Sequence, residues 1–174
     1  MMKKSRLKAA VSVLFAVIAT AGVTLAVPAT AQAASDTIYL ENWANNDCMT
    51  GVLPGYQGVE MDSCDSFWQG SQQWTVTTHP GYDTIENVGW NECLDGREGV
   101  GNLTLATCGV DGTHQHWIEI TELSAGSYTI WGWENQYNNQ CISGWAGYFD
   151  EVATLQECGS TNENQWWEGS ENLP

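Results

Sequence analysis

Positive charge is almost missing from most of this chain. Its five basic residues are Lys3, Lys4, Arg6, Lys8 and Arg97, so no lysine follows position 8. All 21 acids lie beyond position 33, where one arginine opposes them and the formal charge is −20. A field of this sign repels phosphate backbones and attracts cationic groups. The composition therefore excludes nucleic acid as a partner and favours neutral or cationic ones.

Motifs of catalysis and metal binding are also scarce. The sequence contains no C-x-x-C pair and no G-x-S-x-G element. His114 and His116 form an H-x-H, but no third metal ligand follows at a suitable spacing. Paired acids alone do not indicate a glycosidase, because 21 acids make such pairs inevitable. We therefore expect no enzyme, no metal and no cofactor.

One long apolar run is present, from Ala9 to Val27, between a basic stretch and the small-residue sequence ATAQA. This order is typical of a secretory signal peptide, with cleavage after Ala33. The run is also about long enough to span a bilayer, so an uncleaved anchor is the alternative. We expect residues 1–33 to be removed and residues 34–174 to form one secreted, extracellular domain without membrane attachment.

A unit recurs three times in residues 34–174. The six cysteines form pairs spaced by 16, 15 and 17 residues, at positions 48 and 64, 93 and 108, and 141 and 158. A Gln-x-Trp element follows each pair: Gln72–Trp74, Gln115–Trp117 and Gln165–Trp167. Short alternating segments such as TIYL, LTLAT and VATLQ predict strands, and nothing after residue 34 keeps a helical period. The sequence predicts an all-β domain of three repeats, about 36–79, 80–124 and 125–174, with pseudo-threefold symmetry.

With three Gln-x-Trp elements at matched positions, residues 34–174 resemble the ricin-type β-trefoil lectins. The resemblance implies twelve short strands, with the three glutamines holding turns and the core formed around Trp74, Trp117 and Trp167. It also implies one disulfide within each repeat: Cys48–Cys64, Cys93–Cys108 and Cys141–Cys158. The constant spacing agrees, because each pair would close a local loop that contributes about 3 kcal/mol. Zinc is the alternative, although these long intervals suit bonds between strands better.

In this family an acid two residues after the first cysteine binds the sugar. A polar residue and an aromatic lie four and two residues before the second cysteine, and an Asn precedes Gln-x-Trp. The middle repeat matches best, with Ala106 in place of the aromatic. The resemblance implies a main carbohydrate site formed by Asp95, Thr104, His114 and Gln115. The alternative for Asp95 is a turn-capping acid in an Asp-Gly pair.

The other two repeats match less well. The third has Ser143 for the acid and Gln156 for the aromatic, while the first retains nothing typical. The resemblance implies a weaker candidate site in the third repeat, formed by Asn164, Gln165, Trp145 and Tyr148. Trp145 and Tyr148 would supply its stacking face.

Two functions remain open. The first is a secreted, non-catalytic carbohydrate-binding protein, lectin-like, with partly degenerate sites and neutral or cationic glycans as ligands. The second is a secreted β-trefoil subunit whose sugar sites have decayed and which binds a protein, for which the acidic charge favours a basic partner.

Overall fold

The computed structural model describes residues 34–52, 58–65, 69–97, 103–109, 112–125, 128–146 and 151–170. The chain divides into two units, Met1–Ala31 and Gln32–Pro174, and the described residues all belong to the second. None of their helices has the length and apolar character needed to span a membrane. The expected signal peptide, residues 1–33, lies outside the described residues.

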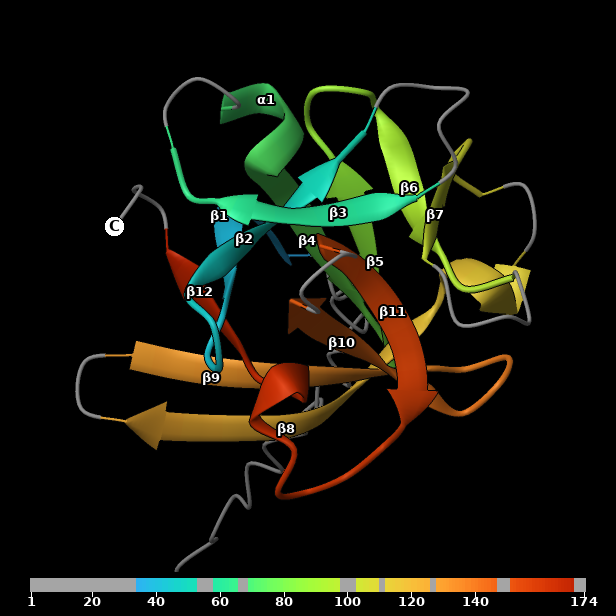
Figure 1. The fold of residues 1–174 in the computed structure, drawn as a ribbon. Helices are drawn as coiled ribbons and strands as arrows, with labels where there is room; N and C mark the ends of the chain where they lie inside the picture. The colour runs from blue at the N-terminus through green and yellow to red at the C-terminus, as the bar shows by residue number, and fades with distance from the viewer. Residues whose placement is uncertain are drawn as a thin grey trace, which may run out of the picture. The chain divides into compact units, whose positions relative to one another are not determined.

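Strands dominate the described residues, and the helical segments are only three or four residues long (Figure 1). In chain order the elements are β1 (Ala34–Asn42), β2 (Asp47–Gly51), β3 (Val59–Ser63), α1 (Gln69–Gln72), β4 (Gln73–His79), β5 (Tyr82–Asn87), β6 (Glu92–Asp95), β7 (Thr104–Ala106), η2 (Gly112–Gln115), β8 (Trp117–Ala125), β9 (Tyr128–Asn135), β10 (Gln140–Ala146), β11 (Glu151–Glu157), η3 (Glu163–Gln165) and β12 (Trp167–Ser170).

Six of these strands close into an antiparallel barrel. β1 pairs with β4 and β12, β5 pairs with β4 and β8, and β9 pairs with β8 and β12. The remaining strands form three hairpins, β2–β3, β6–β7 and β10–β11. A six-stranded barrel with three hairpins is a β-trefoil, and closure of the barrel leaves it without an open edge. The all-β prediction is therefore confirmed.

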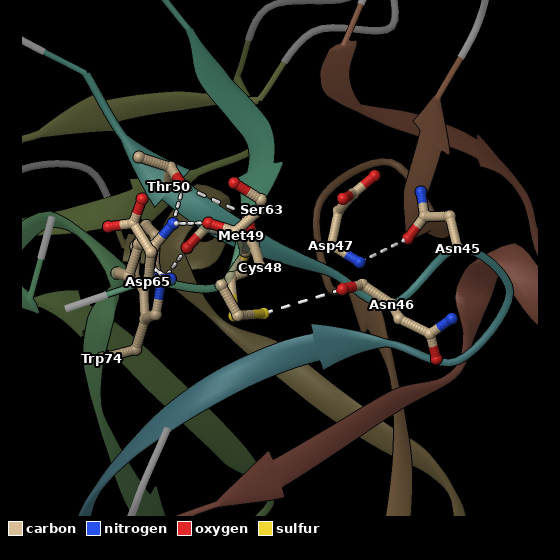
Figure 2. Close-up of a disulfide and its surroundings, with 11 residues drawn as sticks. Asn45, Asn46, Asp47, Cys48, Met49, Thr50, Ser63, Asp65 and Trp74 are labelled. Carbon is tan, nitrogen blue, oxygen red and sulfur yellow. Dashed lines mark hydrogen bonds between the residues drawn. A yellow bond between two sulfur atoms is a disulfide. The ribbon is translucent and has the colours of Figure 1, made fainter. Parts of the chain in front are cut away.

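Each hairpin is joined to the core by one tryptophan. Trp74, Trp117 and Trp167 are fully buried. Each indole N–H donates to the carbonyl of the residue after the first cysteine of a pair, and Figure 2 shows the first case. The bonds are Trp74 to Met49 at 2.8 Å, Trp117 to Leu94 at 3.2 Å and Trp167 to Ile142 at 3.3 Å. The structure thus places these side chains in the core and gives each polar edge a partner.

Three disulfides connect the same hairpins. The pairs are Cys48–Cys64, Cys93–Cys108 and Cys141–Cys158, and no cysteine is free. In each pair the first cysteine lies within the first strand of a hairpin, and the second follows the other strand. Figure 2 shows the first of these bonds beside the turn at Asn45 and Asn46. One disulfide per repeat, as predicted, therefore fastens the open end of each hairpin.

A buried asparagine joins successive repeats. Asn42, Asn87 and Asn135 are fully buried, and each stands six residues before the first cysteine of a pair. Their side-chain amides donate to the carbonyls of Asn164, Ser71 and His114 at 2.7, 2.7 and 2.8 Å. Their side-chain oxygens accept from the backbone N–H groups of Ala44, Gly89 and Tyr137. The carbonyls of Asn164, Ser71 and His114 each belong to the residue before the glutamine of a Gln-x-Trp element. Each asparagine therefore bonds the preceding repeat, and the first repeat bonds the third, so that the three bonds link the repeats in a ring.

Two glutamates face each other where β1 meets β12. Glu41 is the register partner of Glu168. Burial raises the pKa of Glu41, and repulsion from Glu168 and Asp47 raises it further. Burial also raises the pKa of Glu168. Like charges directly opposite each other destabilise a sheet.

We expect Glu168→Gln to raise the melting temperature near neutral pH, by up to about 3 °C because these carboxyls are partly exposed. Both carboxyls titrate higher in the folded protein than in the unfolded chain. Their cost is therefore present above the folded pKa and disappears as pH falls below the ordinary glutamate value. Melting curves across this range should show a gain that fades in acid, and Glu163→Gln on η3 is the control. A gain that persists in acid would contradict the pairing.

Candidate functional site

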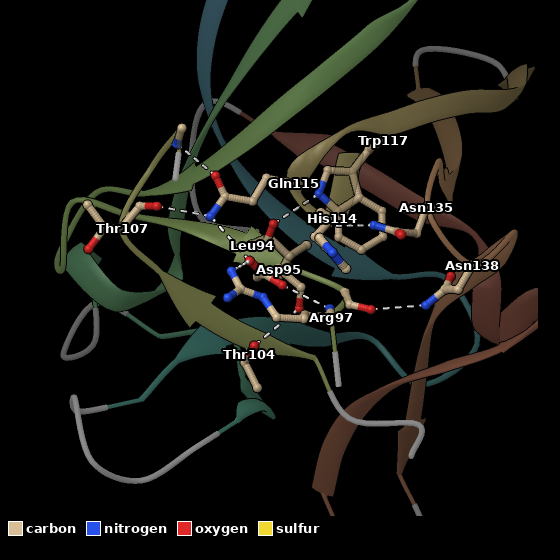
Figure 3. Close-up of polar contacts among 12 residues, drawn as sticks. Leu94, Asp95, Arg97, Thr104, Thr107, His114, Gln115, Trp117, Asn135 and Asn138 are labelled. Atoms are coloured by element: carbon tan, nitrogen blue, oxygen red, sulfur yellow. Dashed lines mark hydrogen bonds and ion pairs between the residues drawn. The ribbon is translucent and has the colours of Figure 1, made fainter. Parts of the chain in front are cut away.

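Asp95 ends β6, and its side chain is fully buried. Oδ1 accepts a hydrogen bond from the backbone N–H of Arg97 at 2.8 Å. Oδ2 accepts from the Arg97 guanidinium at 2.9 Å and from Gln115 Nε2 at 3.3 Å (Figure 3). Arg97 and Gln115 thus bond both carboxylate oxygens of Asp95 from within the chain. The bond to the backbone two residues on is that of a turn-capping acid.

Gln115 holds the turn that follows β7. Its Oε1 accepts from Gly109 N at 2.8 Å and its Nε2 donates to Thr107 O at 3.0 Å. The equivalent amides repeat this pattern, Gln72 with Asp65 N and Ser63 O, and Gln165 with Gly159 N and Glu157 O. The position of Asp95 is also equivalent to that of Thr50, whose hydroxyl accepts from Gln72 at 3.1 Å. Asp95 therefore has a structural role beside any binding role.

Thr104 and His114 contribute less directly than the resemblance implies. The Thr104 hydroxyl donates to the backbone carbonyl of Asp95 at 3.3 Å. The His114 ring packs against Tyr137 with centroids 3.8 Å apart and planes tilted by 39°. Its Nδ1 is buried and has no hydrogen-bond partner among the described residues. The structure thus brings Asp95, Thr104 and Gln115 into contact, while the imidazole of His114 belongs to an aromatic pair.

Tyr137 was not among the predicted site residues. It lies in the turn between β9 and β10, and 56% of it is exposed. Two asparagines hold that turn against the Asp-Gly loop. Asn135 accepts from Tyr137 N at 3.1 Å. Asn138 donates to Gly96 O at 3.0 Å (Figure 3). An aromatic from the next repeat therefore stands near the site that Ala106 leaves without one.

The position of Arg97 was also missed, although it is the one basic residue beyond position 8. Its side chain is 43% exposed while it holds the buried carboxylate of Asp95. The ion pair therefore has one buried member, Asp95, and one partly exposed member, Arg97. Its place two residues after an acid was the available signal, because short Asx turns bring residues i and i+2 together.

The weaker candidates are only partly described. Asn164 is half-buried, and its carbonyl accepts from Asn42. Beside Gln165 lies a cavity of about 250 Å³ that Ile120 and Trp166 also line. The side chain of Trp145 and the whole of Tyr148 lie outside the described residues.

Trp90 does not cover the Asp95 site, because its indole N–H donates to Gly51 O at 2.9 Å. Among the described residues, the His, Cys, Asp and Glu ligand atoms that come within 4.8 Å of one another are those of Glu86, Cys93 and Cys108. The two cysteines of that group form a disulfide, so their sulfurs are not available as thiolates.

Comparison with known proteins places the fold. No family model matches the sequence, and no curated protein matches it. Among solved structures, a GlcNAcα1-4Gal-releasing endo-β-galactosidase from Clostridium perfringens is 13% identical over 76% of this chain and 31% of that chain, with a TM-score of 0.63. Hemolytic lectin CEL-III is 14% identical over 78% of this chain and 32% of that chain, with a TM-score of 0.64. The BEL β-trefoil is 9% identical over 77% of this chain and 91% of that chain, with a TM-score of 0.62.

This chain spans about a third of the length of the endo-β-galactosidase and of CEL-III. At these identities the likeness shows the β-trefoil fold, which agrees with the barrel and hairpins described above.

Proposed function

We propose that this protein is a secreted, non-catalytic carbohydrate-binding protein whose main site lies between the Asp95–Arg97 pair and Tyr137. The observation that carries the proposal is the position of Tyr137, an exposed aromatic ring that packs at a tilt against His114 beside the Asp-Gly loop. A sugar needs an aromatic face for its C–H patch and a few fixed polar groups for its hydroxyls. The described residues supply both at this place.

The polar half of the site is an ion pair rather than a bare carboxylate. Asp95 fixes the guanidinium of Arg97, whose side chain is 43% exposed, so this ion pair lies at the surface where a sugar can reach it. Because the carboxylate is already bonded, a sugar gains fewer charged hydrogen bonds than in an open site. We therefore expect weak affinity, with dissociation constants near about 1 mM.

We propose no catalytic role for this site. Glycosidases need two carboxyl groups at the bond that they cleave. Asp95 is buried, and both of its oxygens are bonded within the chain. The endo-β-galactosidase is thus similar in fold, while the proposed role here is binding.

The second candidate function is a protein-binding β-trefoil with decayed sugar sites. The internal bonding of Asp95 favours it, and the charge of −20 beyond residue 33 favours a basic partner. A glycan array separates the two functions. Saturable signals support sugar binding, and a silent array together with a captured basic protein supports the alternative.

Tyr137→Ala should weaken sugar binding roughly fivefold to tenfold, because it removes the stacking face. Asp95→Asn should weaken it roughly tenfold to a hundredfold, because the amide no longer fixes the guanidinium. Tryptophan fluorescence during titration with a neutral, an amino and a sulfated sugar measures these changes. The acidic field predicts that the sulfated sugar binds least well and that salt narrows the difference.

Tyr82→Ala is the control for this titration. Tyr82 is an aromatic residue stacked on His116, with centroids 3.7 Å apart, and it is not part of the proposed site. Unchanged affinity in both Tyr137→Ala and Asp95→Asn, or tighter binding of the sulfated sugar, would contradict this location.

A further inference from the structure

A second cavity is lined by residues from all six barrel strands, is partly open to solvent, and shares no lining residue with the Asp95 site. It has a volume of about 320 Å³, and its lining includes Asp36, Asp83, Glu119, Trp131 and Trp133. We refer to it as the barrel cavity. Sites for small molecules usually measure about 300–1,000 Å³, so this cavity fits a small ligand.

The acids of the barrel cavity differ in exposure, because Asp83 is buried whereas Asp36 and Glu119 are exposed. Side chains on a strand alternate between its two faces, so residues two apart share a face. Asp36 lies two residues from Ile38, Asp83 two from Ile85 and Glu119 two from Trp117, and all three of these neighbours belong to the core. Inward positions in a barrel normally carry apolar side chains. The buried Asp83 therefore needs an explanation beyond surface solubility, while Asp36 and Glu119 add negative charge to the exposed part of the lining.

Asp83 is the most informative of the three acids. It is 4% exposed, and Oδ2 accepts from the Trp133 indole at 3.0 Å. A buried carboxylate is normally paired with a cation. The one arginine that follows residue 8 is bonded to Asp95 at 2.9 Å, and no lysine follows residue 8. Among the residues that the structure describes, no lysine or second arginine is therefore present to balance Asp83, and a cationic ligand would do so.

Two tryptophans complete the lining. The rings of Trp131 and Trp133 lie 6.0 Å apart with planes inclined by 25°. Gly169 on β12 leaves space for them, because a side chain there would collide with the Trp131 ring. Aromatic faces attract organic cations, and nearby carboxylates strengthen that attraction.

A single metal ion fits this lining poorly. Among the described residues, the search for His, Cys, Asp and Glu ligand atoms within 4.8 Å of one another does not return Asp36, Asp83 and Glu119. The three carboxylates are therefore too far apart to chelate one ion, whereas a larger cation with an apolar body can reach both acids and rings.

We propose that the barrel cavity binds a small organic ammonium ion. Its charged head faces the carboxylates of Asp83, Asp36 and Glu119, and its carbon body packs on Trp131. This binding is separate from sugar recognition at Asp95 and does not depend on it.

Choline and its uncharged isostere 3,3-dimethylbutan-1-ol provide the test, with binding followed by calorimetry and tryptophan fluorescence. Choline should bind, with an affinity that falls as salt rises, and the isostere should bind at least about tenfold more weakly. Asp36→Asn and Glu119→Gln should each weaken choline binding roughly threefold to tenfold. Glu163→Gln carries the same charge change on η3 and should leave it unaltered.

The source of the ammonium group is distinguished by a second pair of probes, glucosamine and glucose. Tighter binding of choline indicates a free amine, and tighter binding of glucosamine indicates an amino sugar. The same titrations on Asp95→Asn distinguish the barrel cavity from the Asp95 site, because that variant should bind choline with unchanged affinity. Equal binding of choline and its isostere, or no binding of either ammonium ion, would overturn the proposal while leaving sugar binding at Asp95 to its own test.

Discussion

Trp117→Ala should lower the free energy of unfolding by about 3–5 kcal/mol, the usual cost of removing a fully buried tryptophan. Trp117 has no exposed surface, and its indole donates to Leu94 O. The substitution opens a cavity at the centre of the core and leaves that carbonyl unpaired. Because the closed Cys93–Cys108 loop restrains the unfolded chain equally in both proteins, it does not hide the loss.

Denaturant unfolding of the oxidised protein measures this effect, and Trp43→Ala is the matched control. Trp43 is 38% exposed, so its loss should cost well under half as much. Trp90→Ala should fall between them, because Trp90 is half-buried and bonded to Gly51 O. Similar losses for Trp43→Ala and Trp117→Ala would show that the Gln-x-Trp tryptophans do not form the core.

The fold could be predicted from the sequence because its determinants are local and occur three times. Each cysteine pair closes a loop of similar length, and each Gln-x-Trp element follows it at nearly the same distance. This repetition predicts the strands, the turns and the disulfides of each repeat at once. The structure agrees at the Cys48–Cys64 disulfide, the buried Trp74 and the turn held by Gln72. An error in predicting the elements of one repeat can be corrected by comparing its sequence with the other two.

The site could be predicted only in part, because it depends on contacts between repeats. The spacing from Cys93 located Asp95, yet it could not show that Arg97 occupies the carboxylate. Tyr137 belongs to the third repeat and reaches the middle one only through the trefoil packing. The sequence thus shows Ala106 in place of the expected aromatic, but it does not show that Tyr137 lies beside the same loop in space.

The barrel cavity escaped prediction for a different reason. Asp36, Asp83 and Glu119 are three acids among 21, and composition alone makes them look like a solvated surface. Their alternation with Ile38, Ile85 and Trp117 becomes informative only after the strands are paired around one barrel. The pairing of the strands, rather than the residue type, brings the three acids to the lining of one cavity.

The asparagines between repeats link stability to the candidate site. Gly96 shows how closely they pack, because a Cβ there would lie 2.7 Å from the Asn135 side chain. Asn135 donates to His114 O and accepts from Tyr137 N, and these two residues form the aromatic pair of the site. Asn87 has the same role in another repeat, where it bonds Ser71 and Gly89. Asn135 and Asn87 therefore make equivalent bonds, but only Asn135 holds residues of the candidate site.

Asn135→Ala and Asn87→Ala should each destabilise the protein by about 1–3 kcal/mol, because each removes a buried amide side chain that donates to one carbonyl and accepts from a backbone N–H. Denaturant unfolding should show similar losses for the two variants. Sugar binding should weaken in folded Asn135→Ala, since Tyr137 and His114 lose their common support, and should remain normal in Asn87→Ala. If both variants bind sugar as tightly as the unmodified protein, the buried asparagines do not influence sugar binding. A weakened Asn87→Ala would instead indicate that general loosening, and not the position of Tyr137, controls the site.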